Sequence, residues 1–181
     1  MVTFLFTDVE GSTRLWAADK NAMSASLLVH DAILRAAIEG NGGYVFTTAG
    51  DSFAAAFGRA SDAVRATSES QSALTNATWP GPALKVRMGL HLSEAEERSD
   101  DYFGPVVNTA ARVEAAGHGC QVLVTDAVRT AAGTRDVTDL GVRSLVAWPS
   151  PSSCSNSAPK RSPRSASSIR RCRTSRSGRR G

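Results

Sequence analysis

A short hairpin in the first third of the chain sets the strongest limit on how it can fold. The segments Tyr44 to Thr48 and Ser52 to Phe57 have the character of strands, and only Ala-Gly-Asp at 49–51 separates them. This pattern is typical of two antiparallel strands joined by a tight turn. Helical patterns flank the pair, over about residues 12–39 and 60–76. A hairpin between two helices predicts a domain that mixes sheet and helix.

Further segments complete the pattern. A buried strand is expected at Val2 to Thr7, and a strand with alternating apolar residues at Leu84 to Leu92. A helix at Pro105 to Ala116, a strand at Gln121 to Thr125 and the start of a final hairpin at 137–145 follow. The order β-α-β-β-α-β, then α-β, predicts an α+β fold. It is a ferredoxin-like βαββαβ domain with an additional αβ extension, whose mostly antiparallel sheet carries helices on one face.

Two aspartates fall at positions that this plan brings together. Asp8 follows the first strand, and Asp51 lies in the hairpin turn. The first strand sits beside the hairpin in the ferredoxin-like plan, so we expect the two carboxylates to be close. Carboxylates are hard oxygen ligands suited to Mg²⁺ or Mn²⁺, and two such ions can activate a hydroxyl and stabilise a phosphate leaving group. On these residues alone, a helix cap at Asp8 and an ordinary turn residue at Asp51 explain the pattern equally well.

The backbone after Asp8 turns from strand to helix, and Ser12 or Thr13 is expected to cap that helix. Amide groups at such a turn can form a nest for phosphate oxygens. The predicted nucleotide-binding residues of this turn are Glu10, Gly11, Ser12 and Thr13.

Charge divides the chain into two parts. Residues 1–147 carry 12 Lys and Arg against 17 Asp and Glu, a net charge of −5, whereas residues 148–181 carry 9 basic residues and no acidic one. The second part is rich in Ser, Arg and Pro, which predicts a disordered basic tail after a domain at 1–147. Nucleic acid is not an expected partner, because Trp148 is the only aromatic residue of the tail and gives no stacking platform.

Composition narrows the class of protein further. The chain has no apolar run of about 18 residues and no basic-then-apolar leader at its start, so neither a membrane span nor a signal peptide is expected. Its three cysteines, Cys120, Cys154 and Cys172, lack metal-like spacing. A sparse, odd set of cysteines fits a reducing compartment, and we expect a cytoplasmic location.

Three motifs stand in order along the chain: FTDVEGST at 6–13, GGYVFTTAGDSFAAAF at 42–57 and DYFGPVVNTAARVEAAGHGCQVLVT at 101–125. With them the sequence resembles the class III adenylyl and guanylyl cyclase catalytic domains over about residues 2–145. The resemblance implies a head-to-tail homodimer that forms a cyclic nucleotide from a nucleoside triphosphate. It also implies two divalent ions, Mg²⁺ or Mn²⁺, held by Asp8, Asp51 and the backbone carbonyl of Val9.

The third motif supplies the residues that meet the nucleotide from the partner subunit in this family. By resemblance, Asp101 reads the base, Asn108 orients the ribose and Arg112 stabilises charge on the transferring phosphate. Asn108 and Arg112 are four residues apart, so they project from the same side of the expected helix. Arginine also offers a planar fork that matches phosphate oxygens.

Two lysines of the family pattern are missing. Thr47 stands at the position of the base-contacting lysine, so ATP is favoured as substrate only by Asp101, which can accept a hydrogen bond from adenine, and GTP stays open. The other lysine falls near Val146, and Arg143 is the nearest basic residue. The main hypothesis is an adenylate cyclase of reduced activity. The alternative is a degenerate cyclase domain that binds nucleotide, or only dimerises, as a regulatory module.

The abrupt change of composition near residue 147 suggests a frameshift. With suitable codons, the neighbouring reading frame of residues 147–161 encodes GLAEPEQLFQLGAEE, which resembles the usual end of these cyclase domains. On this hypothesis the domain has lost its last strand, which would expose a sheet edge. The nucleotide sequence across this point decides it.

Overall fold

The computed structural model describes residues 1–94, 96–98, 101–103, 105–135, 137–143 and 169–174. In chain order the elements are β1 (Val2–Val9), α1 (Ser12–Ala18), α2 (Lys20–Gly40), β2 (Tyr44–Ala49), β3 (Ser52–Phe57), α3 (Ala60–Asn76), β4 (Val86–Ser93), β5 (Glu96–Arg98), β6 (Asp101–Phe103), α4 (Pro105–Ala115), β7 (Val122–Thr125), α5 (Asp126–Ala132), β8 (Thr138–Arg143) and β9 (Ile169–Thr174). None of the described helices is long and apolar enough to cross a membrane.

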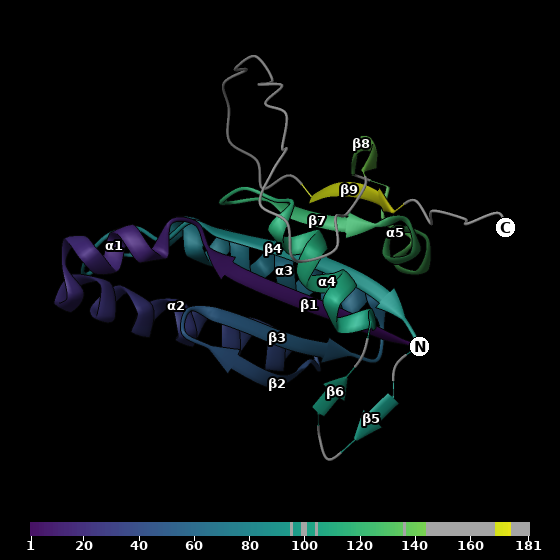
Figure 1. The fold of residues 1–181 in the computed structure, drawn as a ribbon, viewed down its shortest axis with the longest axis horizontal. Coiled ribbons are helices and arrows are strands. Elements are labelled where there is room, and N and C mark those ends of the chain that lie inside the picture. The colour runs from purple at the N-terminus through teal and green to yellow at the C-terminus, as the bar shows by residue number, and fades with distance from the viewer. Residues whose placement is uncertain (95, 99–100, 104, 136, 144–168, 175–181) are drawn as a thin grey trace, which may run out of the picture.

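The main sheet has seven strands in the order β2-β3-β1-β4-β7-β9-β8 (Figure 1). β1 pairs antiparallel with both β3 and β4, and β2 pairs antiparallel with β3. β7 joins β4 in parallel after α4, which is the expected extension. The order of the first four strands is that of the ferredoxin-like plan. The predicted α+β fold with a mostly antiparallel sheet is therefore confirmed for β2-β3-β1-β4-β7.

The two faces of the sheet are covered by different helices. Alternate residues of β1 point to opposite faces, as in any strand. Leu5 and Val9 belong to the main core, whereas Phe4 packs with Ala110 of α4 in a second cluster. In Figure 1, α4 lies in front of β1 and β4, and α2 and α3 lie behind the sheet. The expectation that helices cover one face is wrong for α4.

The long first helix is interrupted. The sequence predicts one helix over about residues 12–39, but Asp19 has an extended backbone, with φ −157° and ψ 105°, and separates α1 from α2. Its carboxylate accepts hydrogen bonds from the amides of Asn21 and Ala22, at 2.9 and 3.0 Å. Asp19 thus satisfies the free amides at the start of α2, and this local gain favours a break over a continuous helix. The cap of α1 is Gly11, not Ser12 or Thr13.

Three strands, β5, β6 and β9, lie outside the sequence-based expectations. The sequence predicts no strand between Leu92 and Pro105, yet β5 and β6 form a small antiparallel sheet there. In the tail, β9 pairs in parallel with β7 and β8, where disorder was expected. An unpaired edge on β7 would leave backbone groups without partners, and β9 supplies them. The other tail residues, 148–168 and 175–181, lie outside the described residues, so their disorder stays a prediction.

Close packing of α4 on β4 depends on Gly89. A Cβ atom at this position would lie 2.3 Å from the backbone nitrogen of Glu114, which cannot move independently of the helix. We expect Gly89→Ala to lower the free energy of unfolding by about 3 kcal/mol, because the helix must shift to remove the clash. Urea denaturation measures this. Gly58→Ala is the matched control, since nothing lies within 4 Å of its Cβ position, and an equal loss in both variants would contradict the expectation.

Candidate active site

Asp8, near the end of β1, and Asp51, directly before β3, lie close together. Each carboxylate is held by the residue next to the other. The Ser52 hydroxyl donates to Oδ1 of Asp8 at 3.1 Å, and the Val9 amide donates to Oδ2 of Asp51 at 3.3 Å. These reciprocal hydrogen bonds fix both side chains across the β1–β3 ladder. The predicted meeting of the two carboxylates is therefore present.

An arginine that the sequence analysis did not single out contacts this pair. Arg87 of β4 stands opposite Asp8 in the β1–β4 ladder. Its Nε and Nη2 both donate to Oδ2 of Asp8, at 3.0 and 2.5 Å. Burial tends to lower the pKa of Arg87, but the negative charges of Glu114 and Asp8 outweigh it, so the pKa lies above its usual value. Asp8 is thus paired with a cation of its own chain.

Glu114 of α4 stands on the other side of the same guanidinium. Oε1 of Glu114 lies 2.6 Å from Nε of Arg87, and Glu114 is only 8% exposed. Burial raises the pKa of Glu114 from 4.5 to about 7, although the charge of Arg87 opposes this. Sequence signals for both residues exist: each is a charged residue between apolar neighbours, in VRM and VEA. Such a residue in a core element usually has a buried partner.

The predicted phosphate nest is altered at its first residue. The amide of Glu10 donates to the carbonyl oxygen of Lys85 at 2.9 Å, so it is already used by the backbone. Gly11 has the left-handed backbone conformation, with φ +73°, that turns the chain from β1 into α1. Ser12 and Thr13 form the first turn of α1. The Glu10 amide is therefore already used, and nucleotide binding by Glu10, Gly11, Ser12 and Thr13 stays a prediction.

The two predicted base-reading residues come from segments that the fold brings together. Thr47 is exposed on β2, next to Phe46, and Asp101 begins β6, next to Tyr102. The rings of Phe46 and Tyr102 are 5.3 Å apart at their centroids, in an edge-to-face arrangement. This aromatic contact joins β2 to β6. The side chain of Asp101 lies outside the described residues.

Asn108 and Arg112 lie on α4, as predicted, with Asn108 exposed and Arg112 half-buried. In the described part of the chain, no hydrogen bond or ion pair joins either residue to Asp8 or Asp51. Within one chain, hydrogen bonds hold the predicted metal residues together, but no such bond among the described residues links them to the predicted ribose and phosphate residues.

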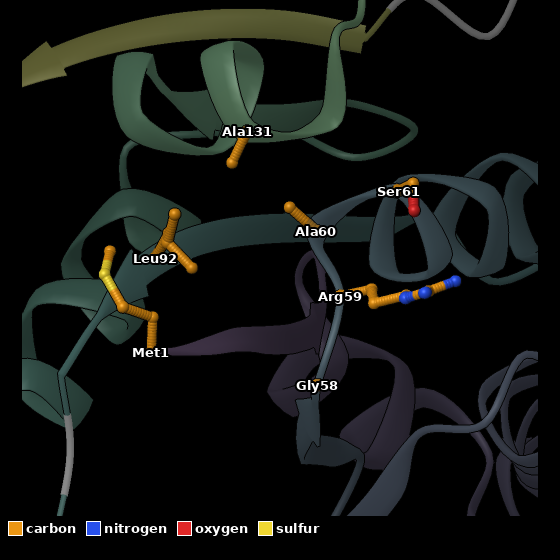
Figure 2. A pocket seen from close by; sticks show the side chains of 7 residues that line it. All are labelled: Met1, Gly58, Arg59, Ala60, Ser61, Leu92 and Ala131. Atoms are coloured by element: carbon orange, nitrogen blue, oxygen red, sulfur yellow. The ribbon is translucent and has the colours of Figure 1, made fainter.

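A surface hollow elsewhere is not a second candidate for this site. It has a volume of about 460 Å³ and is bordered by Met1, Arg59, Leu92 and Ala131, among others (Figure 2). Met1 precedes β1, whereas Asp8 is near its other end, roughly 23 Å away at the rise of an extended strand. The hollow also lacks a carboxylate, so its chemistry differs from that of the aspartate pair.

Comparison with known proteins identifies the family of this domain. The family described as Adenylate and Guanylate cyclase catalytic domain matches residues 1–141. The chain belongs to this family. Similar cyclases include an adenylate cyclase of Podospora anserina, 29% identical over 150 residues, which cover 68% of this chain and 7% of that protein. A receptor-type adenylate cyclase B of Leishmania donovani is 32% identical, and the match covers 70% of this chain and 13% of that protein. The chain thus spans only a small part of these relatives.

Two further comparisons concern an uncharacterised protein and a group of solved adenylate cyclase structures. An uncharacterised protein of Mycobacterium tuberculosis is 38% identical over 128 residues, which cover 70% of this chain and 43% of that protein. Among solved structures, adenylate cyclases of Trypanosoma brucei in their monomeric state align with a TM-score of 0.66 at 28% identity, over 71% of this chain and 74% of that chain. The fold is therefore the cyclase fold.

Class III cyclases typically use two divalent ions, and the donor set of this cyclase domain fits them. Asp8 and Asp51 are partly exposed carboxylates held close together. No group of three or more His, Cys, Asp or Glu suited to a metal occurs among the described residues. A pair of carboxylates is nevertheless the usual protein contribution to Mg²⁺ sites that also use substrate phosphates. A metal ion at Asp8 has to displace or share the hydrogen bonds that Arg87 donates to Oδ2 or the one that Ser52 donates to Oδ1.

Proposed function

We propose that the domain is an adenylate cyclase that converts ATP to 3′,5′-cyclic AMP and pyrophosphate. The observation that supports this most is the aspartate pair at the ends of β1 and β3, held by reciprocal hydrogen bonds. Family membership supports cyclisation, and several relatives at about 30% identity are named adenylate cyclases. In the reaction, the ribose 3′-oxygen bonds to the α-phosphorus, the bond to pyrophosphate breaks and the hydroxyl proton leaves to solvent.

The residues of this chain divide the work between binding and charge stabilisation. Asp8, Asp51 and the Val9 carbonyl would hold two Mg²⁺ or Mn²⁺ ions, which supply Lewis-acid stabilisation to the phosphates. Asn108 orients the ribose so that its 3′-oxygen faces the phosphorus. Arg112 donates to the phosphate as negative charge moves toward the leaving pyrophosphate. Thr47 and Asp101 contact the adenine edge, and the amides of Gly11, Ser12 and Thr13 contact phosphate oxygens.

We propose that two copies of the chain complete the site head to tail, because no hydrogen bond or ion pair among the described residues joins Asn108 or Arg112 to the aspartate pair of their own chain. The uncovered part of the sheet offers a surface for this. Phe6 and Phe46 are only partly buried, and Tyr44 is 53% exposed, on β1 and β2. Apolar surface of this kind, with aromatic rings, is typical of protein interfaces. A dimer of this form would bring the α4 residues of one chain to the carboxylates of the other.

A cyclase assay tests the proposal. Purified full-length chain is incubated with Mn²⁺ and either ATP or GTP, and the cyclic product is measured by chromatography. We expect cyclic AMP, loss of product on adding EDTA, and a loss of about 10²–10³-fold in Asp51→Ala, because the metal-bound phosphates lose a ligand. Product that survives in Asp51→Ala would contradict the assigned chemistry. Preferred turnover of GTP would reassign the substrate.

The second candidate is a degenerate domain that binds nucleotide, or only dimerises, without turnover. Two observations favour it. Thr47 replaces the lysine expected for base contact, and Arg87 already donates hydrogen bonds to the carboxylate of Asp8. Calorimetry with a non-hydrolysable ATP analogue separates the candidates: binding in the micromolar range with no product in the cyclase assay supports the regulatory role.

A further inference from the structure

Arg87 has one Nε–H group and two carboxylates within reach of it. The Nε–H donates to Oδ2 of Asp8 at 3.0 Å. Oε1 of Glu114 lies nearer to Nε, at 2.6 Å, yet this buried oxygen has no hydrogen-bond partner, because the N–H points at Asp8. A buried carboxylate oxygen without a donor is costly. Asp8 and Glu114 therefore compete for a single hydrogen bond.

The position of Glu114 is fixed by packing, so the guanidinium is the part that moves. The backbone of Glu114 sits against Gly89 so closely that no side chain fits between them. Val113, its neighbour on α4, is fully buried. Arg87 extends from β4 between the two carboxylates, and its side chain is 29% exposed. A small rotation of the guanidinium redirects the Nε–H hydrogen bond from Asp8 to Glu114. The positive charge of Arg87 stays within the site.

We propose that Glu114 is a positioning residue that receives Arg87 when a divalent cation binds Asp8. In the metal-free chain Arg87 neutralises Asp8 and keeps its carboxylate ordered. When a cation binds Asp8 in place of the guanidinium, Arg87 turns its Nε–H to Oε1 of Glu114, which until then is near Nε but accepts no hydrogen bond. The exchange lowers the cost of removing Arg87 from Asp8. This inference rests on the metal site of the proposed function but not on turnover.

The test measures binding of Mn²⁺ alone to the full-length chain by electron paramagnetic resonance, without nucleotide. Arg87→Met should tighten Mn²⁺ binding roughly tenfold, because the competing cation is gone. Glu114→Met should weaken it roughly tenfold, because Arg87 has no second acceptor. Glu114→Gln removes the same charge but keeps an acceptor oxygen, so it should weaken binding by only about two- to threefold. The difference between Met and Gln separates positioning from simple loss of charge.

Controls use the exposed pair Arg35 and Glu39 on α2, which are joined at 3.4 Å. Arg35→Met and Glu39→Met should leave Mn²⁺ binding unchanged. Equal weakening in Glu114→Met and Glu114→Gln would overturn the inference, as would unchanged binding in Arg87→Met. If neither the wild type nor Arg87→Met binds Mn²⁺, the metal site itself is wrong. If Mn²⁺ binding follows the expected pattern but no cyclic product forms, this inference holds and only the proposed cyclase activity is contradicted.

A second readout follows Arg87 directly. The ¹⁵Nε–H signal of Arg87 in the nuclear magnetic resonance spectrum should shift when Mg²⁺ is added and stay protected from exchange with water. In Glu114→Met the same addition should remove the protection, since the N–H then faces no acceptor. A signal that does not respond to saturating Mg²⁺ in the wild type would overturn the inference even if the variants were unstable.

Discussion

Mixing two inactive variants is expected to restore cyclase activity. Asp51→Ala damages the metal-binding part of the site, and Arg112→Ala damages the phosphate-binding part. Each variant alone should lose cyclase activity by about 10²–10³-fold. In a head-to-tail dimer each site takes these residues from different chains, so a mixed dimer keeps one intact site and one doubly damaged site. Random pairing makes about half of the dimers mixed, and about a quarter of wild-type activity should return. Formation of cyclic AMP after mixing measures this.

The matched control mixes Asp51→Ala with Asp8→Ala. Both substitutions damage the same side of the site, so every dimer has two damaged sites and activity should stay at the level of the single variants. Activity that does not return in the Asp51→Ala and Arg112→Ala mixture, from a wild type that is active, would rule out a shared site. Sedimentation of the mixture shows whether the chains pair at all.

The nearness of Asp8 and Asp51 could be predicted because it follows from strand order. A β-α-β-β-α-β chain that folds in the ferredoxin-like way puts the first strand beside the hairpin. One residue ends that strand and the other lies in the hairpin turn, so both reach the same end of the sheet. Neither the reciprocal hydrogen bonds nor the role of Ser52 was needed for that inference. Likewise, the spacing of Asn108 and Arg112 predicts a shared helix, and α4 contains both.

The partners of Asp8 could not be predicted, because they depend on register and packing. Arg87 faces Asp8 only because β1 and β4 pair in a particular register, and a shift of one residue would turn Arg87 to the other face. Glu114 approaches Arg87 only because Gly89 lets α4 come close to β4. The break at Asp19 has a similar origin, since a local cap outweighed a helical pattern that continues on both sides.

Stability of the metal-free chain is expected to fall as pH rises from about 4.5 to 7 because of Glu114. The folded chain holds the proton of Glu114 up to a pKa of about 7, whereas the unfolded chain releases it near 4.5. Between these values the folded state binds more protons, so the free energy of unfolding decreases with rising pH. At about 1.4 kcal/mol for each pH unit, the loss amounts to about 3 kcal/mol by pH 8.

Comparison with Glu114→Gln isolates this contribution from the other titrating groups. Urea denaturation at several pH values, with EDTA present, gives the difference in free energy of unfolding between wild type and variant. The difference should fall by about 3 kcal/mol between pH 4.5 and 8, because only the wild type has to ionise a buried carboxyl group. Glu39→Gln, at an exposed site on α2, should show no such slope. A difference that rises with pH would mean that the attraction of Arg87 outweighs burial and holds Glu114 ionised, since the sign of the slope follows the direction of the pKa.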